Sequence, residues 1–291
     1  MKLVNNILWF TLRSHLVVSI AATLLAYQSL LLTGDHDFKN HILLVIFCGT
    51  IFVYNLANII ISIPSKEKKK ISLLSGNLGF HRMLCLLAFM GILFTFNKIS
   101  FQEKLILLFT GTCAVAYVMP FTKNNQRLKG FRNILVIKNI FLAAVWAGAT
   151  AWLPLISKTA ELHSLDMIFI CLKRFFFVLP LAMVFDVRDQ YSDLKNNVKT
   201  LPNQVGINAT KNFAFLSMLF FVMVVFLHQK SMDAIASPLL DFSIPLYISA
   251  VITSVFIFMI NESKKNLYYT LVIDGSMILQ FLLVYSFILV K

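Results

Sequence analysis

The sequence predicts an all-α membrane protein whose nine transmembrane helices form two related halves. Of the 291 residues, 58% are hydrophobic and only 13% are charged, and the mean hydropathy is +0.79. Soluble globular domains carry about 25% charged residues. The apolar residues also gather in runs of about 20, which is the length that a helix needs to cross the hydrocarbon core.

Nine apolar runs are long enough to be spans, and most of the segments between them are short. Nothing has the composition of a soluble domain or a low-complexity linker, so residues 1–291 are interpreted as one membrane domain. The first run is interrupted by Arg13 and His15 but continues beyond them, so we expect a retained membrane helix rather than a signal peptide. The predicted spans are Ile7–Leu32, His41–Ile63, Leu78–Phe96, Glu103–Met119, Asn133–Ile156, Leu165–Arg188, Asn212–His228, Leu240–Ile260 and Tyr268–Val290.

The net charge of +13 predicts an orientation rather than a nucleic-acid partner. Most of the 26 Lys and Arg residues fall in loops on one side of the predicted spans, the side that includes the N-terminus. Cytoplasmic loops of membrane proteins carry such an excess of basic residues. We therefore expect a multi-pass protein of the bacterial cytoplasmic membrane, with its N-terminus and its three longest loops in the cytoplasm.

The sixth span ends in three aspartates, Asp186, Asp189 and Asp193, at positions i, i+3 and i+7. This spacing places all three on one narrow face of a helix. Carboxylates gathered at a membrane boundary repel one another and are costly to desolvate, and a divalent cation compensates both penalties. Magnesium suits carboxylate ligands and bridges to substrate phosphates. We therefore expect these aspartates to be the metal ligands and catalytic residues of a magnesium–diphosphate site. The alternative is a solvated helix end that pairs with Arg188 and Lys195, which are otherwise candidates for substrate binding.

The second span ends in a similar pattern of polar residues. Asn55, Asn58 and Ser62 have the same spacing, end an apolar run and precede a basic loop. Internal repeats are common in membrane proteins, and their sites lie between the repeats. Asn55 and Asn58 are therefore candidates for substrate binding. Chance similarity is one alternative, and helix capping or interhelical hydrogen bonding by the asparagines is another.

Taken together, these features resemble the UbiA-type membrane prenyltransferases. The aspartates Asp186–Asp193, with Lys195 and Thr200–Pro202 after them, are similar to that family's second aspartate-rich motif. The segments Tyr117–Pro120 and Arg127–Lys129 are similar to the linker that enters its fifth helix. The resemblance covers nearly the whole chain and implies a UbiA-like bundle. It also implies Mg2+-dependent transfer of a prenyl group from a prenyl diphosphate to a lipid-soluble acceptor, with magnesium held by two aspartate-rich motifs.

The first of these two motifs departs from the family pattern. Neither way of aligning the pattern around Asn55 leaves a carboxylate in the second span. Amide and hydroxyl oxygens bind a hard cation more weakly than carboxylates do. Glu67 lies just beyond the span, within the basic run Lys66–Lys70, and either the acid or the lysines could reach the diphosphate. A one-metal enzyme, a changed substrate and a lost activity are all compatible with this sequence.

Several basic residues near the fifth span are candidates for binding the diphosphate. Lys138 lies about one and a half turns inside the span and needs an anionic partner, either Asp274 or, as we prefer, a diphosphate oxygen. Arg127, Lys129 and Arg132 precede the span. They suit either phosphate contact or anchoring at the cytoplasmic face.

Other charged residues lie within the spans themselves. Arg13 and Asp274 are interpreted either as functional or as a structural ion pair. Lys173 and Arg174 lie about 20 Å along the helix from Asp186, at 1.5 Å per residue. Because this is too far for the same diphosphate, we expect them to be structural or to extend to the membrane surface.

The leading prediction is therefore a membrane prenyltransferase that binds a prenyl diphosphate, Mg2+ and a small lipid-soluble acceptor such as an aromatic compound. The neutral first motif suggests one alternative, a non-catalytic protein that binds isoprenoids or assembles a lipid pathway. A transporter is the other alternative, since repeats and charged residues within spans are also transporter features.

Overall fold

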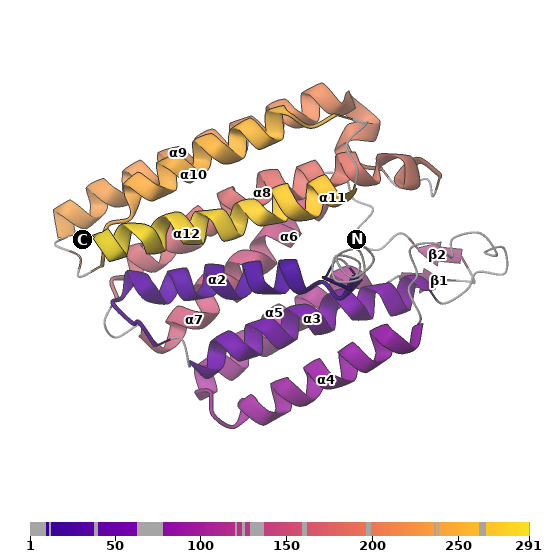
Figure 1. Ribbon diagram of the computed structural model, residues 1–291, viewed down its shortest axis with the longest axis horizontal. Helices are drawn as coiled ribbons and strands as arrows, with labels where there is room; N and C mark the ends of the chain where they lie inside the picture. Colours follow the sequence, from indigo (N-terminus) through magenta and orange to yellow (C-terminus); the bar gives the residue numbers. More distant parts are fainter. Residues whose placement is uncertain are drawn as a thin grey trace, which may run out of the picture.

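The computed structural model describes residues 10–11, 13–37, 40–62, 78–119, 121–123, 126–128, 137–158, 162–195, 199–235, 237, 239–261 and 266–290. In these residues α-helices lie side by side along the long axis of the molecule, beside one short hairpin (Figure 1). Within these described ranges, seven helices are long and apolar enough to cross a membrane, and two shorter apolar helices accompany them. This confirms an all-α, multi-pass membrane protein, whereas the number of nine spans stays a prediction.

Among its described residues, the first half of the chain contains four apolar helices, α2 to α5, followed by the hairpin. The last of these helices begins with a capping box, in which the Glu103 amide donates to Ser100 Oγ (3.2 Å) and the Ser100 amide donates to Glu103 Oε2 (2.6 Å). The elements are α2 (Leu16–Leu32), α3 (His41–Ser62), α4 (Leu78–Phe96), α5 (Phe101–Val118), and the antiparallel strands β1 (Phe121–Lys123) and β2 (Gln126–Leu128).

The second half contains the longest helices and two π-helical turns. Such turns are rare and are found mostly inside α-helices, often at functional sites. The elements are α6 (Ile137–Ala147), a π turn (Gly148–Trp152), α7 (Leu153–Leu155), a 3₁₀ turn (Ile156–Lys158), α8 (Ser164–Lys195), α9 (Leu201–Ile235), α10 (Ser243–Phe258), α11 (Asn266–Tyr268), a second π turn (Tyr269–Ile273) and α12 (Asp274–Val290).

Helix α8 occupies the centre of the bundle. It packs against α9 on one side and α6 on another, while α3 packs against α4, and α2 contacts both α3 and α12. The apolar segment of α8 is 56% buried, whereas that of α5 is only 11% buried. The peripheral helices turn large apolar side chains outward, such as Phe94 and Phe109, as expected of surfaces that face lipid.

One end of the bundle carries the C-terminal part of α8, the hairpin β1–β2 and α11, while the C-terminus lies at the other end (Figure 1). We call the former the motif end, because it holds residues 186–195 of α8. Both polar patterns noted in the sequence approach this end, since α3 and α8 run towards it.

Four predicted span boundaries were wrong. The first span does not continue through residue 15, because His15 has a left-handed backbone (φ 59°) that separates α2 from the preceding turn. Helix α8 continues to Lys195 rather than ending at Arg188, so the aspartates lie inside a helix. Helix α9 runs from Leu201 to Ile235 rather than from Asn212 to His228, and it bends at Gly206, whose φ of 84° suits glycine.

Candidate functional site

The three aspartates of α8 lie in its last turns, but their surroundings differ. The side chains of Asp186 and Asp193 are buried, with 2% and 5% of the residue surface exposed. The side chain of Asp189 is 33% exposed. The helical spacing therefore holds as predicted, while burial divides the aspartates into inner and rim positions.

Asp186 is held by two neighbouring residues of α6. The Lys138 ammonium forms an ion pair with Asp186 Oδ1, and Asn139 Nδ2 donates to Asp186 Oδ2 at 2.9 Å. Both α6 residues are buried. Each carboxylate oxygen thus has a donor, and the charges of Lys138 and Asp186 compensate each other away from water.

This ion pair corrects one expectation about Lys138. Of the two partners considered, neither Asp274 nor a diphosphate is needed to compensate the lysine, because Asp186 does so. The reason is that α6 packs directly against α8. Asn139 was missed altogether, although a polar Lys-Asn pair at the start of an apolar helix was a signal that could have identified it.

Asp189 pairs with its own neighbour, Arg188. The guanidinium donates through Nε to Oδ1 (2.8 Å) and through Nη2 to Oδ2 (2.9 Å), and it lies 4.8 Å from the centre of the Phe185 ring. Both charged side chains are about one-third exposed. This is the pairing that a solvated helix end predicts, and such an exposed pair exchanges readily with a competing ligand.

The asparagines of α3 take part in hydrogen bonds within the protein. Asn55 Nδ2 donates to the carbonyls of Ile51 (2.8 Å) and Ser14 (3.3 Å), and Asn55 Oδ1 lies 2.7 Å from His81 Nδ1. Asn58 Nδ2 lies 2.8 Å from His15 Nε2. These contacts match the alternative of interhelical hydrogen bonding.

The roles of these two histidines were also missed in the sequence. His15 and His81 lie 26 or more residues from their asparagine partners. The His15 ring also lies 5.2 Å from the Tyr54 ring. Nothing in the local sequence indicates contacts across such separations.

Several other predicted site residues lie in parts of which little is described. Arg127 belongs to β2, where its backbone pairs with Thr122, but its side chain is outside the described part, as is that of Lys195. Lys129, Arg132 and the run 66–70 lie outside the described residues. Their roles stay predictions.

At the motif end, α8 has carboxylates that could bind a metal ion, whereas α3 has none. Within the described ranges, no three His, Cys, Asp or Glu side chains are grouped closely enough to hold a metal ion by themselves. Magnesium rarely needs such a cage, because it keeps several waters and uses one or two carboxylates together with substrate phosphates. The α8 aspartates fit this requirement. Helix α3 contains no Asp or Glu and does not fit a second metal site.

Comparison with known proteins identifies the fold. No protein-family model matches the chain, and no curated protein matches it by sequence. The solved structure of a UbiA homolog from Archaeoglobus fulgidus matches with a TM-score of 0.67 at 14% identity, covering 94% of this chain and 96% of that one. The same homolog bound to DMAPP and Mg2+ matches with a TM-score of 0.65 at 17% identity, over 95% and 98% of the two chains.

A third structure extends the likeness. A UbiA homolog from Aeropyrum pernix K1 matches with a TM-score of 0.59 at 12% identity, over 94% of this chain and 97% of the other. The chain therefore has the UbiA-type fold along nearly its whole length, as the resemblance of its motifs predicted.

Proposed function

We propose that this chain with the UbiA-type fold is a membrane prenyltransferase, which transfers a prenyl group from a prenyl diphosphate to a small lipid-soluble acceptor. The observation that carries the proposal is the motif end of α8, where three aspartates share one helix face and the first of them, Asp186, pairs with the buried Lys138. The homolog from Archaeoglobus fulgidus, bound to DMAPP and Mg2+, supports the substrate class. A digeranylgeranylglyceryl phosphate synthase structure with a TM-score of 0.55 and 14% identity, covering 96% of this chain and 95% of that one, supports a lipid product.

The metal requirement that follows is one magnesium ion at α8. Of the three aspartates that the sequence nominates, Asp189 and Asp193 would hold it, while Asp186 would hold Lys138. The exposed Arg188–Asp189 pair opens at little cost, whereas breaking the buried Lys138–Asp186 pair is costly. Bound magnesium would stabilise the negative charge of the departing diphosphate.

Fixed cations of the chain would supply the rest of the charge. A lysine ammonium has three donors, and its ion pair with Asp186 uses one of them. Lys138 can therefore keep its carboxylate partner and still donate to a diphosphate oxygen. Arg188, once released from Asp189, suits bidentate contact with the same group. Arg127, Lys129, Arg132 and Lys195 are proposed to contribute further positive charge from the same cytoplasmic side.

The bundle interior would protect the reaction from water. Loss of diphosphate leaves an allylic cation, which reacts with water unless an apolar site excludes water. Buried apolar side chains of α8, such as Phe177, Leu181 and Val184, follow the aspartates into the bundle. They suit contact with the prenyl chain as well as with neighbouring helices.

The arrangement at α3 favours a second candidate function, a non-catalytic isoprenoid-binding protein. Asn55 and Asn58 already have partners within the chain, so among the described residues of α3 no side chain replaces the carboxylates of a first motif. A protein of this kind would bind prenyl diphosphate without releasing diphosphate.

The deciding experiment measures diphosphate release by the protein in lipid with Mg2+. Farnesyl or geranylgeranyl diphosphate serves as donor and a cell-lipid extract supplies the acceptor. We expect release that chelation of the metal abolishes and that Asp189→Asn lowers at least about 100-fold, as for the loss of an electrostatic catalyst. Asp241→Asn is the matched control. It removes a carboxylate that lies just before α10, away from the motif end, and accepts a hydrogen bond from the Ser243 amide. Absence of release with every donor, in a protein that still binds prenyl diphosphate, would select the second candidate.

A further inference from the structure

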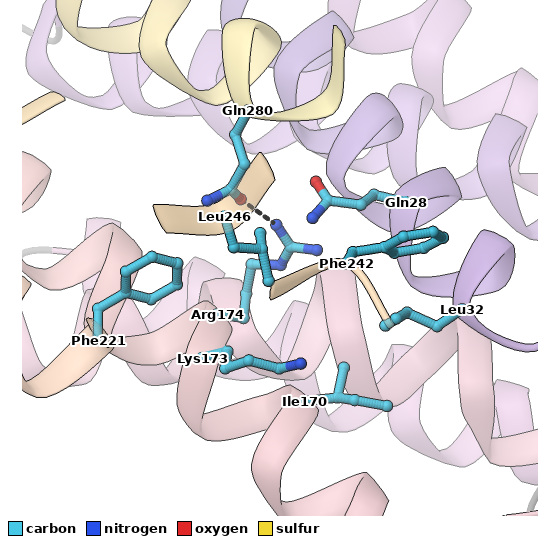
Figure 2. A pocket seen from close by; sticks show the side chains of 9 residues that line it. All are labelled: Gln28, Leu32, Ile170, Lys173, Arg174, Phe221, Phe242, Leu246 and Gln280. Carbon is cyan, nitrogen blue, oxygen red and sulfur yellow. Dashed lines mark hydrogen bonds between the residues drawn. The ribbon is translucent and has the colours of Figure 1, made fainter. Parts of the chain in front are cut away.

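A second polar centre lies inside the bundle, far from the motif end. It surrounds a small hollow between α2, α8 and α12, which is lined by Gln28, Lys173, Arg174 and Gln280 together with apolar residues such as Phe242 and Leu246 (Figure 2). Arg174 precedes Asp186 by twelve residues on α8, which separates them by about 18 Å. The centre is therefore not part of the proposed diphosphate site.

Arg174 is the central cation of this hollow, and its partners are all neutral. Its Nη1 donates to Gln280 Oε1 (3.4 Å), and its Nη2 donates to the Leu25 carbonyl (2.6 Å) and to Ser29 Oγ (3.2 Å). Only 5% of the residue is exposed. Its Nε has no hydrogen-bond partner in the described part of the chain. Of the two roles expected for this side chain, its burial excludes extension to the membrane surface and fits a structural role.

The contacts of the neighbouring Lys173 do not place a carboxylate beside Arg174. Lys173 Nζ lies 2.7 Å from His228 Nδ1, and His228 Nε2 lies 3.0 Å from Asp166 Oδ1. Ser237 donates to the other oxygen of Asp166 at 2.7 Å. This chain of contacts connects Asp166 with Lys173 through the histidine, and a second carboxylate, Asp241, also acts electrostatically on Lys173 and His228. Neither of these carboxylates contacts Arg174, whose hydrogen-bond partners in the described residues are all neutral.

A buried charge without a counter-charge is costly in a membrane protein. Such residues pair, or they mark a binding site. The hollow has about 20 Å³ of space for a water-sized molecule, which is room for about one small ligand. Gln28, on the wall of the hollow, also has a polar atom without a partner, because its Oε1 is buried and accepts no hydrogen bond from the described residues. Rotation of its side-chain amide by 180° would present N–H donors in place of this oxygen.

We propose that this hollow binds a small monovalent anion, of the size of a halide, which compensates Arg174. Arg174 Nε would donate to the anion, Lys173 would add its positive charge and Gln28 would donate from its amide. Apolar side chains complete the wall and exclude water, which strengthens the charge–charge attraction. A single water could satisfy the same hydrogen bonds but would leave the positive charge in place.

The test measures the Tm of the purified protein in a nonionic detergent. The Tm in sodium chloride is compared with the Tm in sodium gluconate at equal ionic strength. Gluconate is too large for the hollow. Because a ligand that binds only the folded state stabilises it, Tm should rise with chloride by roughly 3 °C for each tenfold increase above Kd. Bromide should substitute for chloride and give an anomalous diffraction peak beside Arg174.

Substitutions at the wall separate an anion from a water molecule. Gln28→Glu places a carboxylate beside Arg174, so it should raise Tm in gluconate and abolish the response to chloride. Gln28→Leu, which adds no charge, should leave the protein dependent on chloride. Lys158→Gln, at a partly exposed ion pair with Asp35, should respond to chloride as the wild type does.

The proposal is overturned if Tm in chloride and in gluconate is the same, or if Gln28→Glu keeps the full chloride response. Either result would mean that the hollow holds water only. Neither result affects the proposed transferase activity, which is measured by diphosphate release at the other end of α8.

Discussion

The ends of α3 and α8 carry polar residues at the same spacing, yet their chemistry differs. On α8 the residues are carboxylates, and their partners are the cations Lys138 and Arg188. On α3 the first two are amides, and the partners of these amides are two histidines and backbone carbonyls. The difference teaches that spacing alone does not make a ligand site. The α3 amides contribute to helix packing, whereas the α8 carboxylates keep charge at the rim, where a metal ion can compete for it.

The largest effect on stability is expected at the inner aspartate of α8. Asp186→Asn leaves Lys138 buried without a counter-charge, which should lower the free energy of unfolding by about 3–5 kcal/mol. Reversible unfolding in mixed detergent measures this loss. The double variant Asp186→Asn with Lys138→Met removes both charges and should recover much of the stability. If Asp186→Asn is as stable as the wild type, the buried ion pair is not formed.

At the rim of the same helix, activity and stability should separate. Asp189→Asn should reduce diphosphate release at least about 100-fold while lowering the free energy of unfolding by less than about 1 kcal/mol, because its ion pair is exposed. Parallel activity and unfolding measurements on one preparation test this. Equal losses of activity and folded protein would show that Asp189 is structural.

The amide of α3 should behave in the opposite way. Asn55→Leu removes hydrogen bonds to Ser14 and His81 and should lower the free energy of unfolding by about 1–2 kcal/mol, which is the range of interhelical hydrogen bonds in membranes. Diphosphate release per folded molecule should stay within about threefold of wild type. His81→Leu is the matched variant, and the double variant should be little worse than either single one. A 100-fold loss of activity in folded Asn55→Leu would place α3 in the catalytic site.

The smallest effect is expected at Asn58, nearer the end of α3. Its contact with His15 is only partly buried, so Asn58→Ala should cost about 0.5–1 kcal/mol. Thermal unfolding of Asn58→Ala is compared with that of Lys158→Gln, which removes an exposed ion pair and should cost still less stability. A cost above that of Asn55→Leu would reverse the proposed order of the two amides.

Much of the fold could be predicted from hydropathy. Helix α4 has the predicted bounds, Leu78–Phe96, and α3 ends one residue before the predicted position. The errors arose where the backbone departs from a simple helix, as at His15, or where a helix continues beyond its apolar segment, as α8 does to Lys195. Hydropathy reports the apolar part of a helix, and it reports neither a break in the backbone nor a polar continuation of the helix.

The site was predictable only in part, for a related reason. The common face of Asp186, Asp189 and Asp193 follows from helical periodicity, which is a local property. The choice of Asp186 as the partner of Lys138 depends on how α6 packs against α8, 48 residues away in sequence. The roles of Asn139 and His81 depend on packing in the same way.

The sequence by itself determined that this is a membrane bundle with a row of carboxylates at the end of one helix and a neutral row at the end of another. Hydropathy and periodicity suffice for that, because both act within a single helix. Only the tertiary structure decided which charges are compensated: Asp186 by Lys138, Asp189 by Arg188, and Arg174 by no carboxylate among the described residues. Ion pairing depends on distances between helices, and those distances are set by the packing of the whole bundle.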